Sequence, residues 1–273
     1  MVRAVLTGPV SGILSACVVT AATPYRVDPV TDLTLTLGMF GVAGIEEAFV
    51  KPELAGGHAC PLVASGDYCD KAKINPLDRT VVGNDSAAWR TLSDVGEVSG
   101  VALPVLASAL DASLSGGDSP VGDAATDTLV IAESVAAATL LTGILKLSVR
   151  RPRPVQYLPG RSVASVEEQV SFPSGHTSAA ASGFGAYATT FWLRHPGSPA
   201  RFAVLGGAVL ATGLVGYGRV GGGEHFYTDV IAGAVLGGVL GYLVPIWHRA
   251  DAVPGLAFEI LPGGAGVVWR TGI

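Results

Sequence analysis

The stretch TDTLVIAESVAAATLLTGILKLSVRRPRP, residues 126–154, joins a long apolar run to a cluster of positive charges. The run is rich in Ala and Leu as far as Val149, and its length suits a helix better than a strand. Four cations, Lys146, Arg150, Arg151 and Arg153, then follow within eight residues. This stretch therefore predicts a long helix that carries its positive charge at one end.

Apolar runs separated by Gly, Pro, Asp and Ser clusters recur along the chain. They cover Leu33–Val50, Val95–Leu110, Thr177–Leu193, Phe202–Tyr217 and Val230–Trp247. Few segments alternate with a period of two, so the pattern predicts an all-α bundle of five or six core helices. The exception is the tail, where Leu256–Ile260 and Gly266–Arg270 flank a Pro-Gly-Gly turn and predict a short β-hairpin.

The composition favours a membrane protein. Hydrophobic residues make up 49% of the 273 residues, charged residues only 14%, and the mean hydropathy is +0.48. The last two runs have 16 and 18 residues, near the lower limit for crossing a bilayer, and their Gly and Ala content allows close helix packing in lipid. A soluble bundle with fully buried central helices is the alternative. The net charge of -5 argues against nucleic-acid binding.

The first 22 residues have the layout of a secretory signal or anchor, with Arg3 followed by an apolar run. Within them, Leu14-Ser15-Ala16-Cys17 resembles a lipoprotein signal box, although the four-residue box is weak alone and an ordinary signal peptide, or an uncleaved anchor helix, with an incidental cysteine is favoured. Residues 23–122 then form an N-terminal helical and loop region, residues 123–249 a core, and residues 250–273 a tail. Cys60 and Cys69 bracket a loop short enough for a disulfide, which an exported location would permit, or remain free thiols.

Charge predicts the orientation in a membrane. Arg194, His195 and Arg201 lie between two apolar runs and His248 and Arg249 follow the last run, and positive loops tend to stay in the cytoplasm. The opposite loops would then lie outside. If the signal is cleaved, the mature chain starts outside, so only one of the runs Leu33–Val50 and Val95–Leu110 can span the membrane. The charged pair Glu46-Glu47 counts against Leu33–Val50.

Three blocks of residues carry the chemistry. The basic block 146–154 offers guanidinium forks and an ammonium group to an anion, or is a solvated basic loop. Pro173-Ser174-Gly175-His176 precedes a helix, where free backbone N–H groups bind anions, although an N-cap serine beside a spare histidine is an equal alternative. In the third block, His225 and Asp229 are four residues apart, which places both on one helix face, and Arg219 precedes them.

In an up-down bundle these three blocks share one end. The first ends a helix, the second begins the next helix, and the third lies in the loop two helices further on. Two histidines, a carboxylate and several cations would meet there. This set supplies the nucleophile, the proton donor and the charge neutralisation that phosphoryl transfer requires.

The three blocks resemble the motifs of the type 2 phosphatidic acid phosphatase and vanadium haloperoxidase superfamily. Gly218 departs from the serine that is usual in the motif. Ten specified positions agree with the motif, with all internal spacings kept. These ten positions are Lys146, Arg153, Pro154, Pro173, Ser174, Gly175, His176, Arg219, His225 and Asp229.

The resemblance implies a role for each site residue. His225 would be the nucleophile that forms a phosphohistidine, with Asp229 supporting it, and His176 would protonate the leaving group and then activate water. The phosphate would be held by Lys146, Arg153, Ser174, Gly175 and Arg219. Arg150 and Arg151 lie outside the pattern, as lipid-attracting or merely solvated charges. No metal or other cofactor is expected.

The sequence thus predicts a metal-independent phosphatase for phosphomonoesters, with lipid or isoprenoid phosphates as the expected substrates. Its site would lie on the extracytoplasmic face of the cell envelope. A soluble periplasmic acid phosphatase and a vanadate-dependent haloperoxidase are the alternatives. His58, His195 and His248 show no partners in the sequence and are taken as ordinary loop or interfacial histidines.

Overall fold

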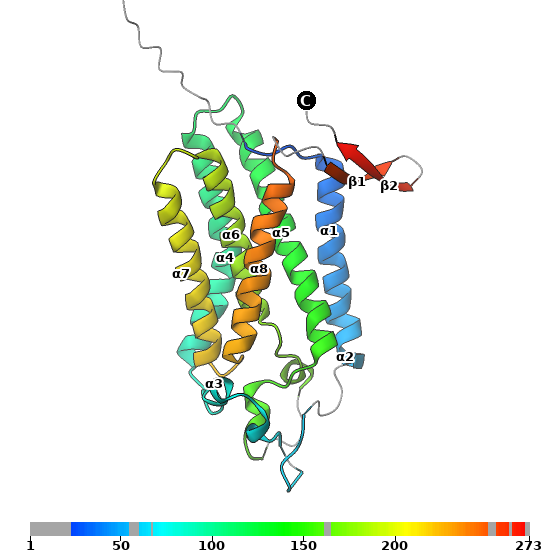
Figure 1. The fold of residues 1–273 in the computed structure, drawn as a ribbon, viewed down its shortest axis with the longest axis vertical. Coiled ribbons are helices and arrows are strands. Elements are labelled where there is room, and N and C mark those ends of the chain that lie inside the picture. Colours follow the sequence, from blue (N-terminus) through cyan, green and yellow to red (C-terminus); the bar gives the residue numbers. More distant parts are fainter. Residues whose placement is uncertain are drawn as a thin grey trace, which may run out of the picture.

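A computed structural model describes residues 23–54, 60–66, 68–160 and 165–250, together with the backbone of two terminal strands. The predicted signal or anchor segment with Cys17, and His58, lie outside the described residues. Within them, six helices of 17 or more residues form the all-α bundle that was predicted (Figure 1). They are α1 (Pro29–Ile45), α4 (Ala87–Leu114), α5 (Pro120–Val149), α6 (Gly175–Arg194), α7 (Ala200–Gly221) and α8 (Tyr227–Trp247).

Short elements connect these helices at one end of the bundle. A π-helical turn (Glu46–Val50) leads into α2 (Lys51–Leu54), and 3-10 turns form at Lys71–Lys73, Pro154–Tyr157 and Val166–Gln169. The small helix α3 (Pro76–Arg79) lies below α4 and α7 in Figure 1. Cys60 and Cys69 are joined by a disulfide, and the Cys69 N–H donates to the Gln156 carbonyl at 2.9 Å. The tail forms the antiparallel strands β1 (Gly255–Leu261) and β2 (Gly264–Arg270), where Phe258 pairs with Val267.

Helix α6 lies at the centre and packs against α4, α5, α7 and α8. Its sequence is rich in Ala, Ser and Gly, and small side chains let helix backbones approach closely. At Gly183, an added Cβ would overlap the carbonyl oxygen of Gly100 on α4. The small residues of α6 therefore explain how one helix can contact four others.

The outer faces of the bundle are apolar. Leu106 on α4, Leu210 on α7 and Val235 on α8 are all exposed, and contiguous exposed apolar surface of this kind indicates a membrane environment. Five helical segments are long and apolar enough to cross a membrane: Pro29–Glu53, Ala87–Leu114, Pro120–Tyr157, Ala200–Gly221 and Tyr227–Trp247.

The segment Pro29–Glu53 is among these five, although Glu46 and Glu47 had counted against Leu33–Val50 as a span. Glu46 and Glu47 follow the last residue of α1, so they lie where the helix reaches the end of the bundle. There Glu47 pairs with Lys51 at 2.6 Å. The charged pair thus ends the apolar part of the helix and does not interrupt it.

The opposite end of the bundle is closed by buried ion pairs. Arg194 pairs with Asp127 and with Asp111, and His195 Nε2 lies 2.8 Å from Asp111. His248 is also buried and paired, with Nε2 2.9 Å from Glu133 and Nδ1 4.0 Å from Asp32. Since its two ring nitrogens face different carboxylates, this group suits a bridging imidazolium better than a single metal ion. Both histidines thus have partners that the sequence did not reveal.

Candidate functional site

The structure brings all eight predicted site residues to the end of the bundle drawn at the bottom of Figure 1. Helix α5 ends there, α6 begins there, α7 ends there and α8 begins there. The Ser174 N–H donates to the Asp229 carbonyl at 3.0 Å, which ties the start of α6 to the start of α8. The Lys146 ammonium lies 3.7 Å from the position that a Cβ on Gly175 would take.

His225 lies in the loop before α8 and is fully buried. Its Nδ1 faces Ser171 Oγ at 3.3 Å and Asp229 Oδ2 at 3.8 Å. Burial lowers the pKa of His225 to about 3, against the opposing attraction of Asp229, and the positive charges of Arg153 and Arg219 lower it further. The imidazole is therefore neutral at pH 7, with a lone pair available for attack.

The prediction that His225 and Asp229 share a helix face is wrong in its geometry. Helix α8 begins at Tyr227, so only Asp229 is helical, in the first turn. The two side chains meet because the Asp229 carboxylate reaches back and accepts from the Phe226 N–H at 2.9 Å. Ser171 Oγ also donates to Asp229, at 2.6 Å, and so lies between the carboxylate and the imidazole.

Arg151 is neither a solvated charge nor part of a lipid-attracting surface. Its guanidinium pairs with Asp229 at 2.6 Å and with Asp78 of α3 at 2.8 Å. Asp78 in turn accepts from the N–H and hydroxyl of Thr228. These contacts hold the pKa of Asp78 below its usual range, against the effect of burial. Arg151 therefore fixes the carboxylate beside His225.

Ser174 caps α6, which is the alternative that the sequence left open. Its buried hydroxyl accepts from the Thr177 hydroxyl at 3.0 Å and faces the Thr177 N–H at 3.5 Å. The serine's own proton remains available to an oxyanion beside the helix start. The structural role and the anion-binding role are thus compatible.

His176, in the first turn of α6, faces two carboxylates of α4. Its Nε2 lies 3.0 Å from Asp94 and 3.0 Å from Glu97. The same Asp94 oxygen accepts from Arg219 at 2.8 Å. One carboxylate therefore links the predicted proton donor to a predicted phosphate-binding cation.

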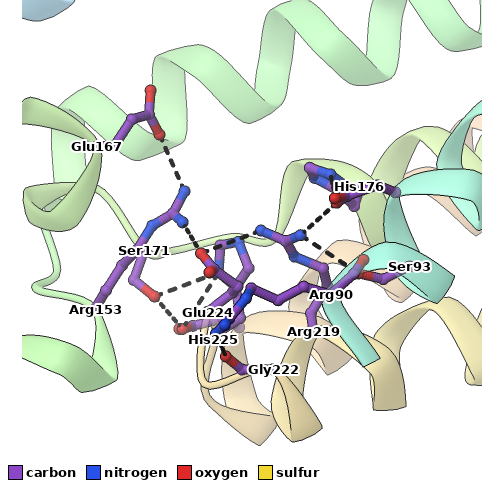
Figure 2. A network of polar contacts seen from close by, with 12 residues as sticks. Arg90, Ser93, Arg153, Glu167, Ser171, His176, Arg219, Gly222, Glu224 and His225 are labelled. Atoms are coloured by element: carbon purple, nitrogen blue, oxygen red, sulfur yellow. Dashed lines mark hydrogen bonds and ion pairs between the residues drawn. The ribbon is translucent and has the colours of Figure 1, made fainter. Parts of the chain in front are cut away.

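Arg153 and Arg219 converge on Glu224, the residue before His225 (Figure 2). The loop that carries Glu224 is fixed by Arg90, which donates to the Gly222 carbonyl at 2.9 Å, and by Asn84, which donates to the Val220 carbonyl at 3.0 Å. Gly223 has a φ of +73° and lies against the Asn84 backbone, so only glycine fits there.

Gly218, the one departure from the family motif, has a packing reason. A Cβ there would lie 2.9 Å from Ser93 Cβ and 2.9 Å from the Trp89 carbonyl oxygen, so α4 and α7 could not approach as they do. Ser93 Oγ instead lies 3.4 Å from the Arg219 guanidinium. A hydroxyl is therefore present beside Arg219, contributed by the neighbouring helix.

Sequence reasoning missed Ser171, Arg151, Asp78, Asp94 and Glu224. Ser171 and Arg151 stand inside the motif blocks, so their position was a usable signal. Asp78 and Asp94 come from segments without any recognisable motif, and nothing in the sequence pairs them with the site.

Comparisons with known proteins agree with this arrangement. Residues 127–252 match the model of the PAP2 superfamily. A lipid A 1-phosphatase of Rhizobium etli is 32% identical over 140 residues, covering 48% of this chain and 53% of the relative. A PA-phosphatase related-family protein of Dictyostelium discoideum is 27% identical over 142 residues, covering 40% and 42%. The matches thus span about half the length of these curated relatives.

Two solved structures are similar at lower identity. A transmembrane PAP2 type phosphatidylglycerolphosphate phosphatase from Bacillus subtilis has a TM-score of 0.45 and 23% identity, covering 78% of this chain and 94% of its own. Aquifex aeolicus LpxE has a TM-score of 0.42 and 20% identity, covering 62% and 92%. Residues 127–252 of this chain thus resemble the PAP2 superfamily, the family whose motifs the sequence also resembles.

Proposed function

We propose that this chain is a metal-independent phosphatase that hydrolyses lipid phosphomonoesters through a phosphohistidine on His225. The observation that carries the proposal is a buried, neutral imidazole beside a fixed carboxylate, within one cluster that also holds His176, Arg153 and Arg219. One relative, a lipid A 1-phosphatase, supports the hydrolysis of a lipid phosphate.

In the first step the Nε2 lone pair of His225 attacks phosphorus and the ester P–O bond breaks. Burial and the nearby Arg219 lower the pKa of His176 to about 4 in the free protein, so in this mechanism the ring takes up its proton together with the phosphate and gives it to the leaving oxygen. Lys146, Arg153 and Arg219 hold the phosphoryl oxygens with Ser174 and the Gly175 N–H. The Nδ1 proton of His225 stays directed at Ser171 and Asp229, which stabilises the positive charge that forms on the ring.

In the second step His176 takes a proton from water, and the resulting hydroxide attacks phosphorus. The P–N bond breaks, which releases inorganic phosphate and returns His225 to its neutral form. His176 is then protonated again, ready for the next ester.

An apolar cavity of about 550 Å³ between α6, α7 and α8 supports a lipid substrate. One end of the cavity is lined by Thr177, Val220 and Tyr227. These residues come one or two positions after His176, Arg219 and His225, respectively. The cavity then continues along the helices to Leu205 and Tyr242. A hydrocarbon chain lying there would leave its phosphate at the cluster of cations.

Filling this cavity should impair long-chain substrates selectively. Gly213 lines the cavity and has nothing within 4 Å of an added Cβ, so Gly213→Leu is expected to fold. We expect kcat/KM for a long-chain lipid phosphate to fall about tenfold, with p-nitrophenyl phosphate hydrolysis unchanged. Gly207→Leu, on the same helix with equal space but outside the cavity lining, is the matched control. Equal losses in both variants would contradict the lipid site.

Phosphate release should survive chelators. Protein cations, and no metal ion, neutralise the phosphoryl oxygens in the proposed mechanism. We expect unchanged kcat after exhaustive dialysis against EDTA, measured as release of inorganic phosphate. Loss of activity that a divalent ion restores would contradict metal independence.

The site end of the bundle is proposed to face the outside of the membrane. The Cys60–Cys69 disulfide lies at this end, through its contact with Gln156, and cytosolic thiols stay reduced.

A further inference from the structure

Glu224 occupies the point where two predicted phosphate-binding cations converge. One of its carboxylate oxygens, Oε2, accepts from Arg153 Nη1 and, at 3.4 Å, from Arg219 Nη2. Two guanidinium groups directed at one oxygen form the arrangement that binds a phosphoryl oxygen. Figure 2 shows the carboxylate between the two arginines, beside His225.

Each arginine also has a carboxylate partner of its own. Arg153 pairs with Glu167 at 3.0 Å, and Arg219 pairs with Asp94 at 2.8 Å. These separate partners orient one edge of each guanidinium. Glu224 differs from them because it pairs with both arginines, through the guanidinium nitrogens that Glu167 and Asp94 leave to it.

We propose that Glu224 is an internal competitor for phosphate, which sets the affinity of the site for its ligands. This inference rests on the proposed phosphatase function. A phosphoryl group has to displace the carboxylate from Arg153 and Arg219 before both can hold it. The displaced charge then stays close by, because the loop around it is fixed by Arg90 and Asn84.

The competition weakens the binding of every anion at Arg153 and Arg219, and free phosphate has no hydrocarbon chain whose burial could compensate. A lipid phosphate gains additional binding free energy from the apolar cavity between α6, α7 and α8. Glu224 therefore favours the release of the product phosphate and keeps soluble anions from occupying the site.

The test is direct titration of inorganic phosphate into the detergent-solubilised protein, which needs no turnover. We expect Glu224→Gln to bind phosphate about tenfold more tightly than the wild type and to show stronger product inhibition. Glu167→Gln removes the same charge beside the same arginine but leaves Glu224 paired with both arginines, so it is the matched control and should bind phosphate no more tightly.

Each outcome of the phosphate titration supports or contradicts the proposed role of Glu224. Unchanged or weaker binding by Glu224→Gln would overturn the inference, and so would equal tightening in both variants, which would be a general charge effect. If neither the wild type nor the Glu224→Gln variant binds phosphate at millimolar concentration, the proposed site itself is wrong. Binding by the wild type without tightening in the variant would refute only the role of Glu224.

Discussion

Replacing His225 by alanine is expected to lower phosphate release by at least about a thousandfold. In the proposed mechanism this imidazole forms the bond to phosphorus, and no neighbouring side chain can take its place. Its burial keeps it neutral, so the wild type should remain active well below pH 6 as far as this group is concerned. The loss should appear in kcat, because the cations that bind the phosphate are untouched.

The covalent intermediate gives a second readout for the same variant. Wild-type protein quenched during turnover should carry an acid-labile, base-stable phosphoryl group, as expected for phosphohistidine, and His225→Ala should carry none. His195→Ala is the control, since this histidine pairs with Asp111 at the opposite end of the bundle. Near-normal turnover by a folded His225→Ala protein, with a thermal transition like that of the wild type, would rule out the nucleophile assignment.

Replacing His176 by alanine is expected to lower hydrolysis of alkyl phosphates by about 10²- to 10⁴-fold. The alkoxide that leaves such a substrate is strongly basic and needs the proton. A p-nitrophenolate leaves without one, so the first step on p-nitrophenyl phosphate should be much less affected. The second step still lacks its base, and the phosphoenzyme should therefore accumulate with this substrate.

These two readouts separate proton donation from a structural role. A burst of p-nitrophenol followed by slow turnover is the expected time course for His176→Ala. Equal losses on alkyl and aryl phosphates, without a burst, would instead indicate that the histidine only supports Asp94 and Arg219.

Short-range pattern was enough to predict the helices and the convergence of the motifs. The blocks around Lys146, His176 and His225 each stand at a helix end, and alternating helix directions bring those ends together. Pattern was not enough for the contacts between segments. The carboxylates that face His176 and Arg219 come from α4, and the pairing of Arg151 with Asp78 joins residues 73 positions apart.

Local spacing also failed where the chain changes direction. A spacing of four positions between His225 and Asp229 reads as one helical turn, yet His225 lies in the loop before α8. The side chains meet because the Asp229 carboxylate reaches back to the Phe226 N–H. Charge alone was also not enough to place Glu46 and Glu47, which follow the end of α1 and do not lie within it.

The contact of Gly100 with Gly183 has a consequence for the distance between His176 and the carboxylates of α4. Helix α4 carries Glu97 one turn before Gly100, and α6 carries His176 two turns before Gly183. Because neither glycine has a Cβ, α4 and α6 lie close together at this point. The spacing of the two helices in turn sets the distance between His176 and its acidic neighbours on α4. A side chain at either glycine would force α4 and α6 apart, and it would thereby change the separation of His176 from Asp94 and Glu97, although neither glycine lies at the site.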